Sequence, residues 1–202
     1  MLGISDYWAF VAAVLVFLAL PGPGTFTLLT ATAKGGLRAG TAATFGLVAG
    51  DQVLMWLAAA GVAAVLQSNQ TLFLALQYVG AAYLIWIGIR LLLAQAGSAG
   101  PIALQPHHFA RQAFLITLMN PKAIMFYMAF FPLFIDAEGH QGFVTFAAMA
   151  ATIAAITVVY CLALCAFAGA ISQRLRSRRW LALALQRAAG VALIGFGLRL
   201  VR

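Results

Sequence analysis

The sequence predicts an all-α polytopic membrane protein with six transmembrane helices, and three observations support this prediction. Of its 202 residues, 64% are apolar and only 8% are charged, whereas a soluble domain carries about a quarter charged residues. Apolar runs long enough to cross a bilayer fill almost the whole chain. The charged residues lie mostly in the short connections between these runs. This composition excludes a soluble enzyme and a disordered chain, and it leaves no room for an extramembrane domain.

The first apolar run is predicted to be a retained helix and not a cleaved signal peptide. No basic region precedes it, Asp6 stands there instead, and the run continues past the prolines at 21 and 23. We therefore expect one transmembrane domain over residues 1–202. The predicted spans cover residues 7–33, 41–66, 72–96, 110–135, 142–171 and 180–201.

The distribution of Lys and Arg predicts the orientation. The connections after the first, third and fifth spans carry eight basic residues and no acidic one. The opposite side carries Asp6, Asp136 and Glu138, with Arg199 and Arg202 as the discordant basic residues. Because Lys and Arg collect on the cytoplasmic side, both termini are predicted to face outward, which in a bacterium is the periplasm. The net charge of +8 thus indicates topology, and no nucleic-acid partner is expected.

Two segments of similar sequence indicate an internal repeat. The third span ends in Ile-Gly-Ile-Arg-Leu at 87–91, and the sixth ends in Phe-Gly-Leu-Arg-Leu at 196–200. The predicted repeats cover about 5–96 and about 110–202. Since each repeat holds an odd number of spans, the second must be inverted in the membrane. Inversion places Arg199 outside, which explains why that arginine departs from the charge rule.

Prolines interrupt the first and fourth spans, at corresponding places in the two repeats. Pro-Gly-Pro stands at 21–23 and Asn-Pro at 120–121. Proline removes a backbone donor and clashes with the preceding turn, so we expect helices 1 and 4 to be broken there. Inverted repeats with broken helices are typical of secondary transporters, whose substrate site lies near the bilayer midplane.

Two charged residues, Asp51 and Lys122, lie inside predicted spans. Counted from the cytoplasmic ends at Thr41 and Arg111, both lie about 15–17 Å deep at the helical rise, as does the break at 21–23. A charge at that depth costs at least ~2.5–3.5 kcal/mol, so each should face the protein interior and have a partner. One interpretation is an ion pair that only locks two spans together. We favour a functional site, because broken helices lie at the same depth.

The chemistry of these groups suits a zwitterion. The N-terminus of a half-helix offers N–H groups and a positive dipole to a carboxylate, and Lys122 would reinforce that attraction. Asp51 would take either an ammonium group or a proton. Gly46 and Gly50 form a GxxxG pair one turn before Asp51 and predict close packing of the second span against a neighbour. An apolar and aromatic lining is expected from Met55, Trp56, Phe126, Tyr127 and Phe130.

The remaining reactive side chains indicate no cofactor, metal or catalytic site. Cys161 and Cys165 share one helix face and are interpreted as small core residues. The histidines at 107, 108 and 140 lie in predicted loops without Cys or acidic partners at ligand spacing. No Ser/His, paired-Asp or metal constellation supports an intramembrane enzyme.

Four motifs in order resemble the LysE/RhtB superfamily of amino-acid exporters, and most closely its leucine-exporter branch. They are Leu-Pro-Gly-Pro-Gly at 20–24, Gly-Leu-Val-Ala-Gly-Asp at 46–51, Gly-Ala-Ala-Tyr-Leu-Ile-Trp-Ile-Gly at 80–88 and Leu-Met-Asn-Pro-Lys-Ala at 118–123. The resemblance implies a six-span protein of the bacterial inner membrane that exports small neutral amino acids by proton antiport. The motif positions that carry over as substrate-binding candidates are Pro21, Gly22, Pro23, Asp51, Asn120, Pro121 and Lys122.

The expected partners are therefore a small amino acid, a coupling proton and the lipid bilayer, while a monomer and a homo-oligomer both stay open.

Two alternative functions also stay open. The first is an exporter of another small solute or of an ion, although an ion exporter would need several convergent ligands and Asp51 alone is available. A non-transporting membrane scaffold would tolerate joint replacement of Asp51 and Lys122 by apolar residues.

Overall fold

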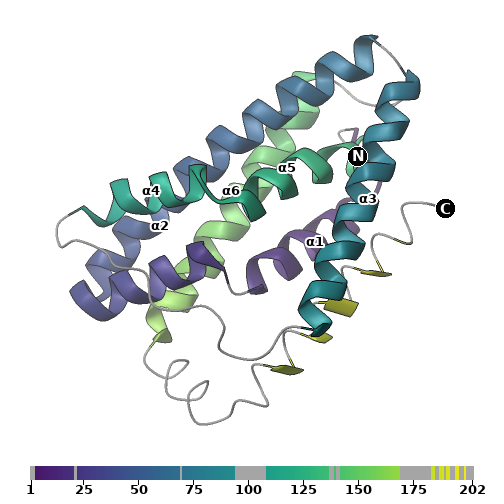
Figure 1. The fold of residues 1–202 in the computed structure, drawn as a ribbon. Helices are drawn as coiled ribbons and strands as arrows, with labels where there is room; N and C mark the ends of the chain where they lie inside the picture. Colours follow the sequence, from purple (N-terminus) through teal and green to yellow (C-terminus); the bar gives the residue numbers. More distant parts are fainter. Residues whose placement is uncertain are drawn as a thin grey trace.

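A computed structural model describes residues 3–20, 22–68, 70–93, 108–136, 139 and 142–168, with a few further residues between 183 and 198. These residues form helices, and the only β-type pairing among them is an isolated bridge between Ile4 and Ile135. Figure 1 shows α5 near the middle of the view, α1 below it and α3 along one side. The helices are α1 (Tyr7–Ala19), α2 (Pro23–Ser68), α3 (Gln70–Leu93), α4 (Phe109–Leu118), α5 (Pro121–Phe134) and α6 (Phe143–Ala166).

The first predicted span is broken, as its prolines predict. The helix α1 begins after Asp6, whose carboxylate accepts a hydrogen bond of 2.9 Å from the Ala9 amide. It ends at Ala19, because Leu20 is extended. The next helix begins at Pro23, a residue suited to a first helical position because it has no amide hydrogen to leave unpaired. Pro21 lies outside the described residues.

The helix α2 contains the second part of the first predicted span and the whole of the second predicted span. Its backbone leaves the helical conformation at Gly35 and Gly36, and Gly36 has a φ of 66°, which favours glycine. The predicted connection at 34–38 is therefore a tight turn and not an open loop. The two halves pack on each other, since a Cβ added at Gly24 would lie 3.4 Å from the Leu47 side chain.

The fourth predicted span is also broken. Two helices, α4 and α5, replace it and meet at an angle of 61°. Asn120 caps α5: its side-chain oxygen accepts a hydrogen bond of 3.1 Å from the Lys122 amide, and Pro121 follows at the first helical position. Both are typical helix-start signals, and they fix the position of the break.

By length and hydropathy, two of the described helices can cross a membrane, Pro23–Val62 and Phe143–Ala166, and the bent α4–α5 pair is a third if it counts as one span. The third predicted span overlaps α3. Most of the sixth lies outside the described residues, although the described positions between 183 and 198 are helical. The protein is thus largely helical and apolar. Six spans, one domain and the division at 5–96 and 110–202 stay predictions.

Glycines allow the closest helix contacts. A Cβ added at Gly46 would collide with the backbone of Ala110, and one at Gly50 would lie 2.8 Å from Thr117. The predicted close packing of the GxxxG pair is therefore confirmed, with α4 as the neighbour. On α3, a Cβ at Gly88 would lie 2.6 Å from the carbonyl of Gly190, so α3 packs equally closely against the C-terminal segment.

We predict that Gly46→Ala destabilises the protein by about 1–3 kcal/mol, because the new methyl group overpacks the contact with α4. Gly61→Ala is the matched control, since it lies in the same helix with open space around its Cβ position. There, alanine should be neutral or should stabilise the helix by about 0.5–1 kcal/mol. Thermal unfolding in detergent measures both, and equal shifts would show that the contact contributes little.

Candidate functional site

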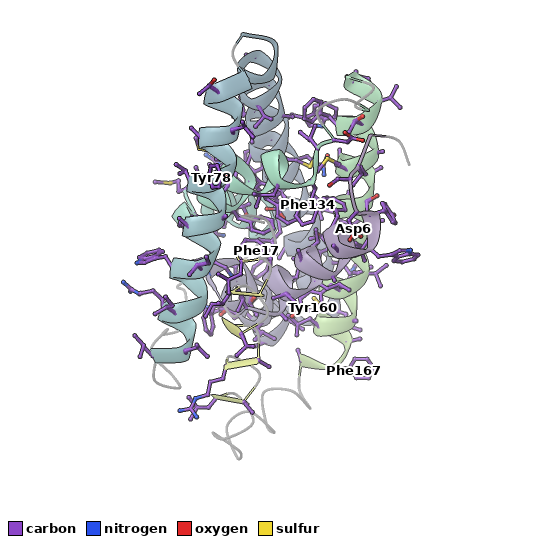
Figure 2. All side chains as sticks on the ribbon, turned by 90° about the vertical axis from the view of Figure 1, so that its right-hand side faces the viewer. Asp6, Phe17, Tyr78, Phe134, Tyr160 and Phe167 are labelled. Carbon is purple, nitrogen blue, oxygen red and sulfur yellow. The ribbon has the colours of Figure 1, made fainter. Side chains whose placement is uncertain are left out.

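A cavity of about 70 Å³ lies where the end of α1, both halves of α2, the α4–α5 break and α6 meet. Figure 2 shows two of its lining side chains, Phe17 and Tyr160, between the helices, whereas Phe167 lies at the end of α6. The cavity is lined by Phe17, Leu18, Leu20, Gly22, Gly24, Thr25, Leu28, Leu47, Asp51, Thr117, Asn120, Lys122, Ala123, Thr157, Tyr160, Cys161 and Leu164.

The structure brings four of the seven sequence-predicted residues to this cavity: Gly22, Asp51, Asn120 and Lys122. Pro23 and Pro121 begin the two half-helices beside it, and Pro21 lies outside the described residues. The counting of helical rise therefore placed Asp51, Lys122 and the first break at a common depth, and the fold places them around a common space.

Tyr127 on α5 contacts the Asp51 carboxylate directly. Its phenol makes a side-chain hydrogen bond to Asp51, and the Lys122 charge also acts on Asp51 electrostatically. Tyr127 is 2% exposed, so this hydrogen bond is inside the protein. Since Asp51 is on α2, the bond ties α2 to α5 at the edge of the cavity and leaves other carboxylate lone pairs for a ligand.

The Lys122 ammonium binds the end of α1. Its Nζ donates hydrogen bonds of 3.0 Å to the Leu20 carbonyl and 3.5 Å to the Phe17 carbonyl, and it lies 4.5 Å from the centre of the Phe17 ring. The last carbonyls of a helix have no partner within the helix and form the negative end of its dipole. Lys122 thus caps α1 from the start of α5 and joins the two helix breaks.

This arrangement differs from the ion pair considered in the sequence. Among the described residues, Asp51 is hydrogen-bonded to Tyr127 and Lys122 to the α1 carbonyls. The two charges influence each other through the cavity without a direct ion pair. The structure therefore places a carboxylate on α2 and an ammonium on α5, and both residues line the same cavity.

Two helix N-termini border the cavity. Gly24 and Thr25 in the first turn of α2 line it, as do Asn120 and Ala123 at the start of α5. The first four amides of a helix have no partner within it, and Asn120 satisfies one of them, that of Lys122. The positive ends of both helix dipoles are thus available to an anionic group.

The α6 wall was not predicted from the sequence as part of a site. It consists of Thr157, Tyr160, Cys161 and Leu164, which share one helix face by their spacing. Cys161 and its neighbour Cys165 are free buried thiols; Cys165 packs in the core as predicted, whereas Cys161 also lines the cavity. The spacing of these residues was visible in the sequence, but α6 is apolar all round, so no face stood out.

Thr157 carries an unsatisfied polar atom. It is 2% exposed, and its hydroxyl oxygen has no hydrogen-bond partner within the described structure. A buried polar group left unpaired costs about 1–3 kcal/mol. An unpaired hydroxyl on the wall of a cavity therefore indicates a place where a bound molecule belongs.

The expected aromatic lining is wrong. Met55, Phe126 and Phe130 are at most 1% exposed and belong to the hydrophobic core, where the rings of Phe126 and Phe130 stack at 4.3 Å. Trp56 stacks on Phe143 at 5.4 Å. Two residues of this group contact the site from behind: Tyr127 is hydrogen-bonded to Asp51, and Phe126 stacks at 3.6 Å on Phe17, which lines the cavity. The apolar lining comes instead from Phe17, Leu18, Leu28, Leu47 and Leu164.

The protein has strongly apolar helices, and two helix breaks border a cavity lined by a carboxylate and an ammonium group. These features are characteristic of membrane transport proteins. The chain belongs to the LysE-type translocator family, whose model matches residues 15–202. The family resemblance of the four motifs is thereby confirmed.

The relatives are similar over their whole length. A membrane protein of Pseudomonas aeruginosa is 34% identical, over 98% of this chain and 96% of its own. The leucine efflux proteins of an Enterobacter species and of Salmonella typhimurium are 33% and 31% identical, each over 98% of this chain and over 96% and 95% of their own. No solved structure matches this chain.

Proposed function

We propose that the protein is a secondary exporter of small neutral amino acids, leucine or its analogues among them, across the bacterial inner membrane. One observation carries the proposal: Asp51 and Lys122, on different helices, both line one cavity beside two half-helix N-termini. The printed names of two relatives, leucine efflux proteins, support the substrate class.

The cavity offers complementary groups for each part of a zwitterion. Asp51 attracts the substrate ammonium, and the N-termini of α2 and α5 with Lys122 attract the carboxylate. Leu28 and Leu47 line the cavity and give an apolar side chain a matching surface. A free amino acid therefore fits these groups better than a peptide with distant ends or a simple ion does.

Export against a gradient needs an energy source, and we propose antiport with protons. Asp51 is the ionisable acid in the cavity, so it binds either the exchanged proton or the substrate ammonium. Alternating access would use the two helix breaks as hinges between inverted repeats, with both termini in the periplasm. The amino acid, the proton and the lipid bilayer are the partners in this scheme.

Two other functions compete with this proposal. A metal-ion exporter needs several convergent ligands, and no group of three or more His, Cys, Asp or Glu side chains that could hold a metal exists in the described part of the chain. A non-transporting scaffold needs neither a cavity nor an unpaired hydroxyl on its wall. A transport role explains both features. Since we propose a transporter, we also infer that the protein is not an enzyme.

Cells loaded with a panel of amino acids and dipeptides test the proposal directly. We expect the protein to accelerate the efflux of leucine and similar neutral amino acids. A protonophore should reduce that efflux to the rate of cells without the protein. Efflux that is unchanged by the protonophore would contradict proton antiport. The absence of efflux for every amino acid would contradict the proposal that the protein is an amino-acid exporter.

A further inference from the structure

We propose that the Thr157 hydroxyl is a specificity-determining hydrogen-bond acceptor, which with Asp51 forms a subsite for an unsubstituted primary ammonium group. This inference rests on the proposed function and makes it more specific. It assigns to α6 a role in recognition that neither the sequence motifs nor the named relatives provide.

The position of Thr157 is the first support. It lines the cavity one helical turn before Cys161 on the same face of α6, and Cys161 lies close enough to Asp51 for an electrostatic interaction. The Thr157 side chain and the Asp51 carboxylate therefore line the same cavity as Lys122 and Asn120.

The state of its hydroxyl is the second support. Threonines in helices usually bond back to the carbonyl of the preceding turn, and those of Thr27, Thr32, Thr44 and Thr152 do so at 2.8–2.9 Å. The Thr157 hydroxyl makes no such bond, although Thr157 is also helical and is as buried as Thr27 and Thr44. Its hydrogen-bonding capacity is thus free inside a hydrophobic helix.

The chemistry of an ammonium group matches what the cavity lacks. A primary ammonium has three N–H donors. The Asp51 carboxylate, which already accepts from Tyr127, takes one or two of them and the Thr157 oxygen takes another. N-methylation of the substrate removes one donor and puts a methyl group in its place. Thr157 should therefore favour primary α-amino acids over N-methylated ones.

Purified protein in proteoliposomes tests the subsite with three variants. Thr157→Val keeps the shape and removes the hydroxyl, while Thr157→Ser keeps the hydroxyl. Thr152→Val is the matched control on the same helix, because the Thr152 hydroxyl is bonded to the Ala148 carbonyl and lies 3.3 Å from the Tyr7 hydroxyl. The readouts are the half-saturating concentrations of leucine and N-methyl-leucine and the melting temperature.

We expect Thr157→Val to raise the half-saturating leucine concentration by about tenfold or more, since a hydrogen bond to a charged group is lost. Its preference for leucine over N-methyl-leucine should shrink, and its melting temperature should equal or exceed that of the wild type. Thr157→Ser and Thr152→Val should bind leucine like the wild type. Thr157→Ala gives the same comparison if valine prevents folding.

The outcomes separate this inference from the proposed function. If the wild type transports leucine and the folded Thr157→Val protein has the same affinity and the same preference, the subsite is wrong and the exporter stands. If Thr157→Val and Thr152→Val raise the half-saturating leucine concentration equally, the effect is not specific to the subsite and the inference is also overturned. A wild type that transports no amino acid overturns the proposed function itself.

Discussion

Asp51→Asn is expected to abolish proton-driven efflux of amino acids while the protein still inserts into the membrane. Asparagine has nearly the same shape, and its side-chain oxygen can still accept the hydrogen bond that Tyr127 gives to Asp51. The substitution also removes a charge that is costly inside a bilayer. The fold should therefore be kept, while the negative charge that attracts a proton or an ammonium group is lost. Efflux from proteoliposomes with an imposed pH gradient measures the effect.

Exchange of labelled for unlabelled leucine, without a pH gradient, distinguishes the two roles of Asp51. If Asp51 binds only the exchanged proton, the asparagine variant loses net efflux and keeps exchange. If Asp51 binds the substrate ammonium, both activities disappear. Asp136→Asn is the matched control, because Asp136 is an exposed carboxylate outside the cavity, and it should transport like the wild type. Undiminished net efflux in the Asp51 variant would remove this residue from the mechanism.

The helix breaks could be predicted from the sequence because their cause is local. Proline constrains its own backbone and the residue before it, and Asn120 before Pro121 is a start signal for a helix in any context. The close packing at Gly46 and Gly50 is similar, since the absence of two side chains on one helix face is visible in the sequence, although the neighbour, α4, was not predicted. The common depth of Asp51 and Lys122 followed from the fixed rise of a helix.

The partners of these charges could not be predicted, because they depend on how helices are rotated and where their ends meet. The sequence placed Asp51 and Lys122 at one depth and left an ion pair between them open, but the ammonium reaches the carbonyls of Leu20 and Phe17. Those carbonyls are backbone atoms, and only the three-dimensional path of α1 brings them to Lys122. Thr157 was not predicted as a site residue for a related reason. Apolar residues occur on every face of α6, so its sequence does not tell which face borders the cavity.

The role of Lys122 leads to a second strong expectation. Lys122→Met should abolish efflux, because it removes the cation beside the α5 N-terminus. It should also destabilise the protein by about 1–3 kcal/mol, since the α1 carbonyls would lose a buried hydrogen-bond donor. Lys122→Arg keeps the charge and the donors, so it should recover most of the stability. Unfolding in detergent and efflux in proteoliposomes measure the two effects separately.

The double variant Asp51→Asn with Lys122→Met decides between a transport site and an ion pair that only locks helices together. For a locking ion pair, loss of one charge leaves the other uncompensated, and loss of both restores stability. The observed hydrogen bonds predict instead that the double variant is as unstable as Lys122→Met alone, because the α1 carbonyls stay uncapped when Asp51 is also neutral. The coupling energy between the two substitutions should thus be small. A scaffold predicts wild-type behaviour of the double variant in cells, whereas an exporter with this site predicts a protein that still inserts into the membrane, is destabilised like Lys122→Met, and moves no leucine.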